Sequence, residues 1–217
     1  MCAPLQPEPA RRIVPDPKRI LAASRHALAA AALLAAGGPA LAADPSQEAR
    51  ALVETCLGCH GIAGYMNAYP NYHVPKLGGQ KAAYIVAALQ AYRAELRPHG
   101  TMHAQAATLS DEDMRRIAAW FEAAGNVEPG AAGGDAPTQA ATCVACHGET
   151  GVAPSPDFPT LAGQYADYLA RSLRQYKSAE RQNPIMAGFA AQLSDEDIER
   201  LAAWYGGQNG LVTPALD

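Results

Sequence analysis

Apolar residues recur along much of this chain at intervals of three and four, the spacing of α-helices that bury one face. The clearest stretch follows Ser110, whose hydroxyl is suited to accept a hydrogen bond from a free backbone N–H at a helix start. Its apolar positions are Met114, Ile117, Ala118 and Phe121. A matching stretch follows Ser194, with Ile198, Leu201, Ala202 and Tyr205. The pattern predicts a capped helix after each serine.

Other segments are also predicted to be helical. Residues 80–92 and 164–176 carry apolar side chains along one face and form a middle helix in each half of the chain, and a short helix covers about 46–54. No convincing strand pattern, in which apolar and polar residues alternate, interrupts these helices. The predicted fold class is therefore all-α.

The chain repeats itself. Residues 75–121 fall on residues 159–205 at a constant offset of 84, and 21 of the 47 aligned residues are identical. Such self-similarity indicates a duplicated structural unit. The segment between the copies, 124–137, is rich in Gly, Ala and Pro and is predicted to be a linker. The sequence therefore predicts two tandem domains, over 43–123 and 138–217.

The first 42 residues have the composition of a secretory signal. Five basic residues precede an apolar run over 27–36, and small residues follow at Ala40 and Ala42. Residues 1–42 are therefore predicted to be a signal peptide cleaved after Ala42, and Arg11-Arg12 is a hint of twin-arginine export. The alternative is an uncleaved membrane anchor, but the apolar run is shorter than the ~20 residues that a spanning helix requires.

Composition narrows the classes of function. Hydrophobic residues make up 49% of the chain and charged residues 18%, as in globular proteins. Without residues 1–42 the chain keeps 12 basic and 19 acidic side chains. This acidic balance disfavours nucleic acid, whose phosphates attract clustered Lys and Arg, and is compatible with a basic protein partner.

Four of the five cysteines lie in two nearly identical stretches, TCLGCHG from Thr55 and TCVACHG from Thr142. A C-x-x-C-H motif attaches haem c, because two thiols one helical turn apart can each form a thioether to a haem vinyl group. The imidazole of the next residue then binds the iron. The predicted attachment sites are Cys56, Cys59, Cys143 and Cys146, and the predicted proximal ligands are His60 and His147. The chain is thus expected to hold two haem c groups.

Three other uses of these cysteines are alternatives. A zinc site uses Cys and His, a thioredoxin-like dithiol uses C-x-x-C in a βαβ context, and an exported protein can form structural disulfides. The histidine directly after each cysteine pair, behind a predicted export signal, favours haem over all three.

The sixth iron ligand is predicted from the repeat. Met102 and Met186 are the methionine pair that the offset of 84 preserves, and each lies after a middle helix in a polar segment that is predicted to be a loop. A thioether opposite a histidine raises the reduction potential of a haem. His99 and His103 flank Met102 and are alternative ligands of the first iron, or else exposed loop residues. Met114 lies on an apolar helix face and is predicted to be core.

The surroundings of the iron ligands are predicted in part. A metal-bound imidazole usually donates its other N–H to an acceptor that fixes the ring. The backbone carbonyls of Pro75 and Pro159 are candidates, since the repeat preserves both residues. Bonds to haem propionates, core packing and solvated charge stay open for four further repeated residues, Trp120, Trp204, Arg97 and Arg181.

These features together resemble the dihaem cytochrome c4 family within the class I cytochromes c. The resemblance rests on two C-x-x-C-H units, each followed by P-x-L-[GA]-G-Q, a distal methionine and LSDED…AAW, and it covers nearly all of the chain after residue 42. It implies two tandem cytochrome c-like domains, each with a few helices wrapped around a covalently bound haem. One departure is a longer loop in the first unit, 64–74, which holds Tyr65, Tyr69, Tyr72 and His73, the last predicted to lie on the surface.

The resemblance implies an electron carrier of the bacterial periplasm and not an enzyme, since two six-coordinate irons leave no position for a substrate. Family members carry electrons from a bc1-type complex towards a haem-copper terminal oxidase, and contact with the membrane is expected only through such complexes. An alternative is the electron-accepting subunit of a periplasmic dehydrogenase, such as a flavoprotein that oxidises sulfide or an alcohol. A dihaem peroxidase or a thiosulfate-oxidising cytochrome is a third hypothesis, and homodimerisation stays open.

Overall fold

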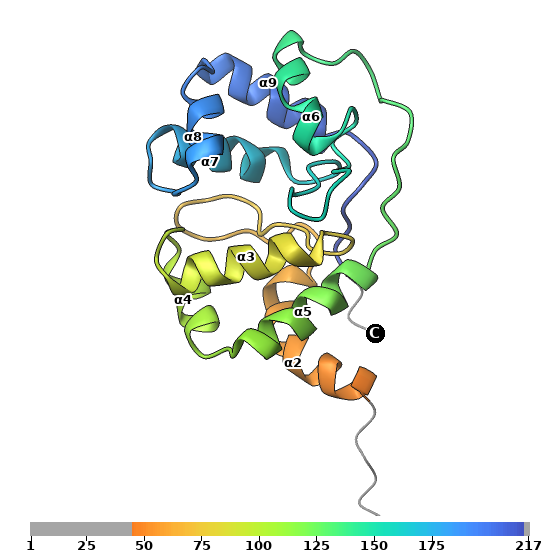
Figure 1. Cartoon of the computed structure of the whole chain (residues 1–217), viewed down its shortest axis with the longest axis vertical. Helices are drawn as coiled ribbons and strands as arrows, with labels where there is room; N and C mark the ends of the chain where they lie inside the picture. The colour runs from red at the N-terminus through yellow and green to blue at the C-terminus, as the bar shows by residue number, and fades with distance from the viewer. Residues whose placement is uncertain (1–44, 215–217) are drawn as a thin grey trace, which may run out of the picture. The chain divides into compact units, whose positions relative to one another are not determined.

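The computed structural model describes residues 45–214. The predicted signal peptide, 1–42, lies outside the described residues. The described chain forms two helical lobes, one before and one after the segment 124–137, which runs alongside them (Figure 1). Extended pairing in this part of the chain is limited to isolated β-bridges. The predicted all-α class is confirmed, and the exact domain boundaries 43–123 and 138–217 stay predictions.

The first lobe packs its helices around one core. The helices are α2 (Pro45–His60), α3 (Ala82–Arg93), α4 (Gly100–Ala107) and α5 (Asp111–Ala123). Helix α3 contacts both α4 and α5, and α2 packs against α5. The helix predicted over 46–54 continues to His60, because Val53 and Leu57 lie one turn apart on the same buried face.

The second lobe repeats this plan with a shorter first helix. Its elements are η1 (Thr138–Thr142), α6 (Val144–His147), α7 (Ala166–Lys177), α8 (Pro184–Ala190) and α9 (Asp195–Gly206). Helix α7 packs against α8 and α9, and the core of this lobe contains Leu169, Ile198 and Leu201. The duplication seen in the sequence is therefore a duplication of structure.

The lobes are joined by hydrogen bonds that the duplication repeats. Gln80 donates to the Thr160 carbonyl and accepts from the Thr160 N–H, each at 2.9 Å. Gln164 donates to the Lys76 carbonyl and accepts from the Lys76 N–H, also at 2.9 Å. Helices α3 and α7 were predicted to begin at these glutamines but begin two residues later, because each glutamine is held at the junction.

Both predicted serine caps are present. Ser110 Oγ accepts from the Asp113 N–H, and Ser194 Oγ accepts from the Asp197 N–H, each at 3.1 Å. In return, each aspartate side chain accepts from the backbone N–H of its serine. These reciprocal bonds form the capping boxes that begin α5 and α9.

Ser194→Ala is expected to lower the free energy of unfolding by about 1 kcal/mol, because the Asp197 N–H loses its side-chain acceptor at the start of α9. Guanidinium unfolding followed by circular dichroism measures the change. Ser178→Ala is the control. Ser178 lies at the C-terminal end of a different helix, α7, and its hydroxyl donates to the Gln175 carbonyl. An equal loss in both variants would contradict the role of the cap.

Candidate functional site

The first cysteine motif lies at the C-terminal end of α2. Cys56, Cys59 and His60 occupy the last turns of this helix, and Cys56 packs against the core of the lobe. The Nδ1–H of His60 donates to the Pro75 carbonyl at 2.8 Å. The predicted carbonyl acceptor for this imidazole is therefore confirmed.

The second motif repeats this arrangement. Cys143 stands at the N-cap of α6, and His147 is its last residue. The Nδ1–H of His147 donates to the Pro159 carbonyl at 2.9 Å, so the second predicted acceptor is also confirmed. Gly148 then turns the chain away with a φ of 79°, where an added Cβ would lie 2.1 Å from the Val152 carbonyl oxygen.

Both imidazoles are held neutral. Burial lowers the pKa of His60 to about 4 and outweighs the raising effect of its bond to Pro75, and burial also lowers the pKa of His147. Because a carbonyl oxygen can only accept, the proton is on Nδ1 and the lone pair is on Nε2. This tautomer is the one that binds a metal through Nε2.

Met102 and Met186 lie in helices, so the prediction that they lie in loops is wrong. Each is in the first turn of a short helix, α4 or α8. The residue three positions earlier caps each helix: His99 Nδ1 accepts from the Met102 N–H at 3.2 Å, and Asn183 Oδ1 accepts from the Met186 N–H at 3.0 Å. Histidine is outside the usual N-cap residues, so the sequence pattern does not predict α4.

The histidines predicted on exposed loops have structural partners instead. His99 caps α4, and its ring lies edge-on to Tyr92 with the centroids 6.2 Å apart. His103 lies on α4 and donates its Nδ1–H to the Tyr92 carbonyl at 3.0 Å. His73 bonds to Asp167 of the second lobe. Full exposure is therefore wrong for His99, which is partly buried, and a loop position is wrong for His103, which lies within α4. His73 lies in the insertion loop as predicted, with its side chain 31% exposed.

A cavity of about 370 Å³ brings the predicted residues of the second site together. It lies between the second lobe and α3, and its lining includes Cys143, Cys146, His147 and Met186. Apolar side chains of α7, α8 and α9 form much of its wall. Protein cores hold few voids larger than a water molecule, whereas ligand sites span roughly 300–1,000 Å³. The lining fits a largely apolar group, with an imidazole and a thioether among the side chains around it.

Buried polar groups at the site fit a ligand that carries carboxylates. Arg97 and Arg181 are only 7% and 6% exposed, and within residues 45–214 neither forms an ion pair with a carboxylate. Buried cations normally have an anionic partner. Solvated charge is therefore wrong for both arginines, and contacts to haem propionates are favoured.

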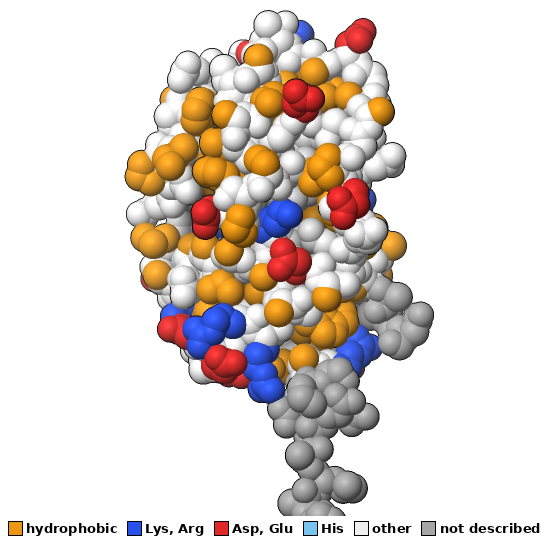
Figure 2. All heavy atoms as spheres, turned by 45° about the vertical axis from the view of Figure 1, so that its right-hand side comes forward, with side chains coloured by type: hydrophobic (Ala, Val, Ile, Leu, Met, Phe, Trp, Pro, Cys, Tyr) orange, Lys and Arg blue, Asp and Glu red, His pale blue; other side chains and the backbone are white. Residues whose placement is uncertain are grey.

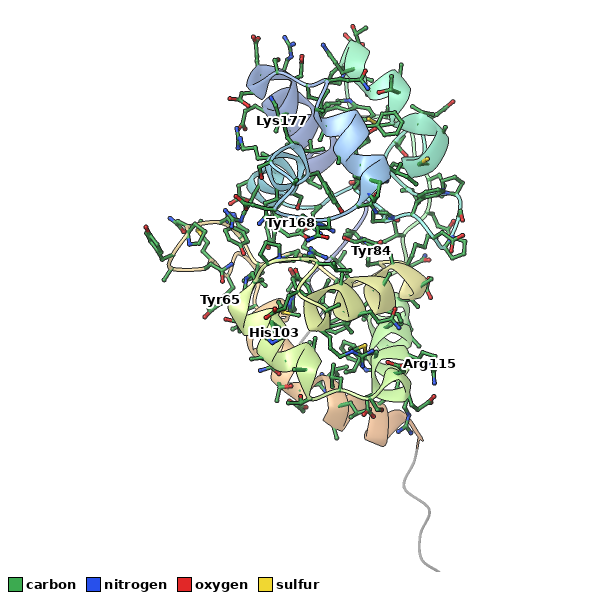
Figure 3. All side chains as sticks on the ribbon, turned by 60° about the vertical axis from the view of Figure 1, so that its left-hand side comes forward. Tyr65, Tyr84, His103, Arg115, Tyr168 and Lys177 are labelled. Atoms are coloured by element: carbon green, nitrogen blue, oxygen red, sulfur yellow. The ribbon has the colours of Figure 1, made fainter. Side chains whose placement is uncertain are left out.

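The sequence did not reveal which side chains these two arginines contact. Arg97 donates to the Tyr168 hydroxyl, and Arg181 donates to the Tyr84 hydroxyl at 2.9 Å, so each bond crosses between the lobes. Figure 3 shows Tyr84 and Tyr168 at the junction. Burial opposes ionisation of Tyr84, but the charges of Arg181 and Arg97 outweigh it and lower the pKa of Tyr84. The sequence held one signal for these contacts, since Tyr84 and Tyr168 occupy equivalent positions at the offset of 84.

Known proteins resemble most of the chain. Residues 40–121 and 131–204 match the family described as cytochrome c oxidase, cbb3-type, subunit III. Reduced recombinant cytochrome c4 from Pseudomonas stutzeri has a solved structure that is 31% identical, with a TM-score of 0.59, over 77% of this chain and 100% of that chain. Cytochrome c4 of Stutzerimonas stutzeri is 33% identical over 196 residues, or 78% of this chain and 92% of the relative. The chain belongs to the cytochrome c4 family.

Membership of the cytochrome c4 family settles the cofactor and the general activity. The chain carries two covalently bound haem c groups in two tandem cytochrome c domains, and this replaces the zinc, dithiol and disulfide alternatives. It is an electron carrier, and its partners are redox proteins. The thiosulfate dehydrogenase electron acceptor of Stutzerimonas stutzeri is also similar, at 30% identity over 168 residues, or 69% of this chain and 77% of that relative.

The surface of this chain carries both charged and apolar side chains. On the face in Figure 2, acidic side chains are spread over both lobes among apolar ones. Between residues 45 and 214, no helix has the length and apolar character needed to cross a membrane.

Proposed function

We propose that the two haems are held by the residues that the motifs and the repeat predict. The thioether residues are Cys56 and Cys59 for one haem and Cys143 and Cys146 for the other. The iron ligands are His60 with Met102, and His147 with Met186. The observation that carries this proposal is the single cavity lined by both cysteines, the histidine and the methionine of the second set.

The ligands of the first iron are supported by the contacts of the neighbouring histidines. His99 Nδ1 accepts from the backbone at the start of α4, and the Nδ1–H of His103 donates to the Tyr92 carbonyl. Because Nδ1 of His99 accepts, its proton lies on Nε2, and His99 has no free lone pair for the iron. Nε2 of His103 lies 3.7 Å from Oε1 of Glu95, on a side chain that is 41% exposed. This favours Met102 over either histidine as the sixth ligand.

The residues of each site suit an electron carrier. Haem c supplies a reversible Fe(III)/Fe(II) couple when it is bound. The Pro159 carbonyl fixes the ring and the tautomer of His147, and a thioether such as that of Met186 favours the reduced state. Apolar walls limit the access of water, which also tunes the reduction potential.

The proposed route runs from a bc1-type complex to a haem-copper terminal oxidase in the bacterial periplasm. It is supported by the similarity to cytochromes c4 and by the signal peptide predicted over 1–42. A second function is an electron-accepting subunit of a periplasmic dehydrogenase. The observation that favours it is the similarity to a protein named as the electron acceptor of thiosulfate dehydrogenase.

Stopped-flow mixing of the purified oxidised holoprotein with reduced bc1-type complex is expected to reduce both haems, and mixing of the reduced form with a haem-copper oxidase is expected to reoxidise them. Affinity purification from the source cells runs in parallel. A stable stoichiometric dehydrogenase partner, together with slow exchange with both respiratory complexes, would overturn the shuttle in favour of the subunit.

A further inference from the structure

The insertion loop, residues 64–74, folds as a small hairpin. Met66 and His73 form an antiparallel β-bridge, and the Val74 N–H donates to the Tyr65 carbonyl at 2.8 Å. Figure 3 shows Tyr65 on this loop near the junction of the two lobes. The three extra residues of the first lobe therefore build an ordered element beside that junction.

His73 attaches this hairpin to the second lobe. It donates both its backbone N–H and its Nδ1–H to one oxygen, Oδ2 of Asp167, at 2.9 Å and 2.8 Å. The other oxygen, Oδ1, accepts from the Tyr168 N–H at 2.8 Å in the first turn of α7. The Asp167 carboxylate therefore links the insertion loop directly to α7.

Tyr165, the N-cap residue of α7, provides a second attachment. Its ring stacks on the ring of His73, with centroids 4.5 Å apart and planes at 19°. Its hydroxyl accepts from the Gly64 N–H at 2.8 Å. Just after the loop, Lys76 Nζ donates to the Gly163 carbonyl at 2.5 Å and lies 4.7 Å over the same tyrosine ring. Both ends of the loop are thus attached to one short segment of the second lobe.

These attachments are one-sided. At the offset of 84, Ala83 stands in the first lobe where the second has Asp167, and Lys81 stands where it has Tyr165. Neither residue supplies a carboxylate or a phenol ring. The equivalent loop of the second lobe is also three residues shorter. The insertion loop therefore adds contacts to the junction that the duplication does not repeat.

The junction needs such contacts if its geometry is to be fixed. Many of its hydrogen bonds join polar side chains, such as those of Gln80 and Gln164, and domains joined through polar interfaces move relative to one another by default. The rate of transfer between two bound groups, here of an electron between two haems, depends steeply on their separation and orientation. A contact that limits the motion of the lobes would therefore act on the rate of exchange between the haems.

We propose that the insertion loop is a one-sided clasp between the lobes, and that His73, Tyr165 and Asp167 are positioning residues for electron transfer between the two haems. The proposal rests on the haem sites assigned under the proposed function. In the step concerned, one electron leaves the ferrous iron of one lobe and reduces the ferric iron of the other. No proton, bond or further reactant takes part.

The clasp can be weakened without unfolding the protein. The side chains of His73 and Asp167 are 31% and 38% exposed, and polar pairs this exposed to solvent contribute little to the stability of a fold. His73→Ala removes the Nδ1–H bond and the stacked ring. Tyr165→Phe is milder, because it keeps the ring and removes only the acceptor of the Gly64 N–H. Lys81→Ala is the matched control at the repeat position of Tyr165.

Two measurements on the full holoprotein test the proposal. Hydrogen–deuterium exchange over 61–76 reports directly on the Gly64 and His73 N–H groups, whatever the state of the haems. Pulse radiolysis of the oxidised protein introduces one electron per molecule, and the concentration-independent phase that follows reports exchange between the haems. Spectroelectrochemistry gives the two reduction potentials.

In His73→Ala and Tyr165→Phe, these amides are expected to exchange faster, and the phase that reports electron exchange between the haems is expected to be severalfold slower. Both reduction potentials are expected to keep their wild-type values. Lys81→Ala is expected to match the wild type in every measurement. Wild-type protection in both clasp variants would overturn the clasp itself. Faster amide exchange with an unchanged inter-haem phase would overturn the positioning role. Wild-type protein without two six-coordinate low-spin haems would instead refute the proposed ligands, and the amide measurement would still decide whether the clasp exists.

Discussion

A chain in which Cys143→Ser is combined with Cys146→Ser is expected to carry one covalent haem instead of two. A serine hydroxyl does not form the thioether that a thiol makes with a haem vinyl group, so the second motif loses both of its attachment points. The first motif, with Cys56 and Cys59, lies on a separate helix and keeps its own haem. Intact mass after denaturation counts the covalent haems per chain.

The same double substitution is expected to loosen the second lobe. The cavity of about 370 Å³ that adjoins the motif is then no longer filled by a tethered group. Even small core cavities cost on the order of 1 kcal/mol or more, so a space of this size left open would use up much of the stability of a small domain. Limited proteolysis is expected to cut the variant first within 138–214.

Thr142→Val is the control for this prediction. Thr142 precedes Cys143 and donates to the Gln139 carbonyl at 3.0 Å, but it has no part in haem attachment. This variant is expected to keep two covalent haems. A double cysteine variant that also kept two would show that the second haem is attached elsewhere, and the assignment of Cys143 and Cys146 would be wrong.

Local patterns in the sequence predict much of this structure because the interactions behind them are local. A serine three residues before an aspartate, followed by apolar residues at helical spacing, was enough to place the starts of α5 and α9 at Ser110 and Ser194. The acceptors at Pro75 and Pro159 were also predictable, since an imidazole on iron needs an acceptor and the repeat preserves both prolines.

Contacts between the lobes were not predictable, because they join residues far apart in the sequence, such as Arg97 and Tyr168 at 71 positions and Gly78 and Val212 at 134 positions. His73 looks like a surface residue in the sequence until Asp167 and Tyr165 are placed beside it. Arg97 looks like an exposed cation until the fold buries it against the Tyr168 hydroxyl. In such cases, tertiary partners override the polarity that the residue type suggests.

Met186→His is expected to lower the reduction potential of the second haem by on the order of 0.1 V, a modest part of the ~0.8 V range that axial ligands span. Imidazole in place of the thioether favours the ferric state. The helix that carries the residue should persist, because Asn183 caps α8 through the backbone N–H of position 186 and not through its side chain. Spectroelectrochemical titration resolves the shift, with the first haem as an internal reference.

Met114→Leu is the matched control for this ligand change. Met114 is fully buried in the first lobe, as predicted for a core residue, and a swap that conserves volume costs less than about 1.5 kcal/mol. This variant is expected to keep both potentials and the whole methionine-to-iron charge-transfer band of the ferric protein. Met186→His is expected to lose the share of that band contributed by the second site. A full band and an unchanged potential in Met186→His would remove Met186 as a ligand, and because Met102 is assigned by the same repeat, would weaken that assignment equally.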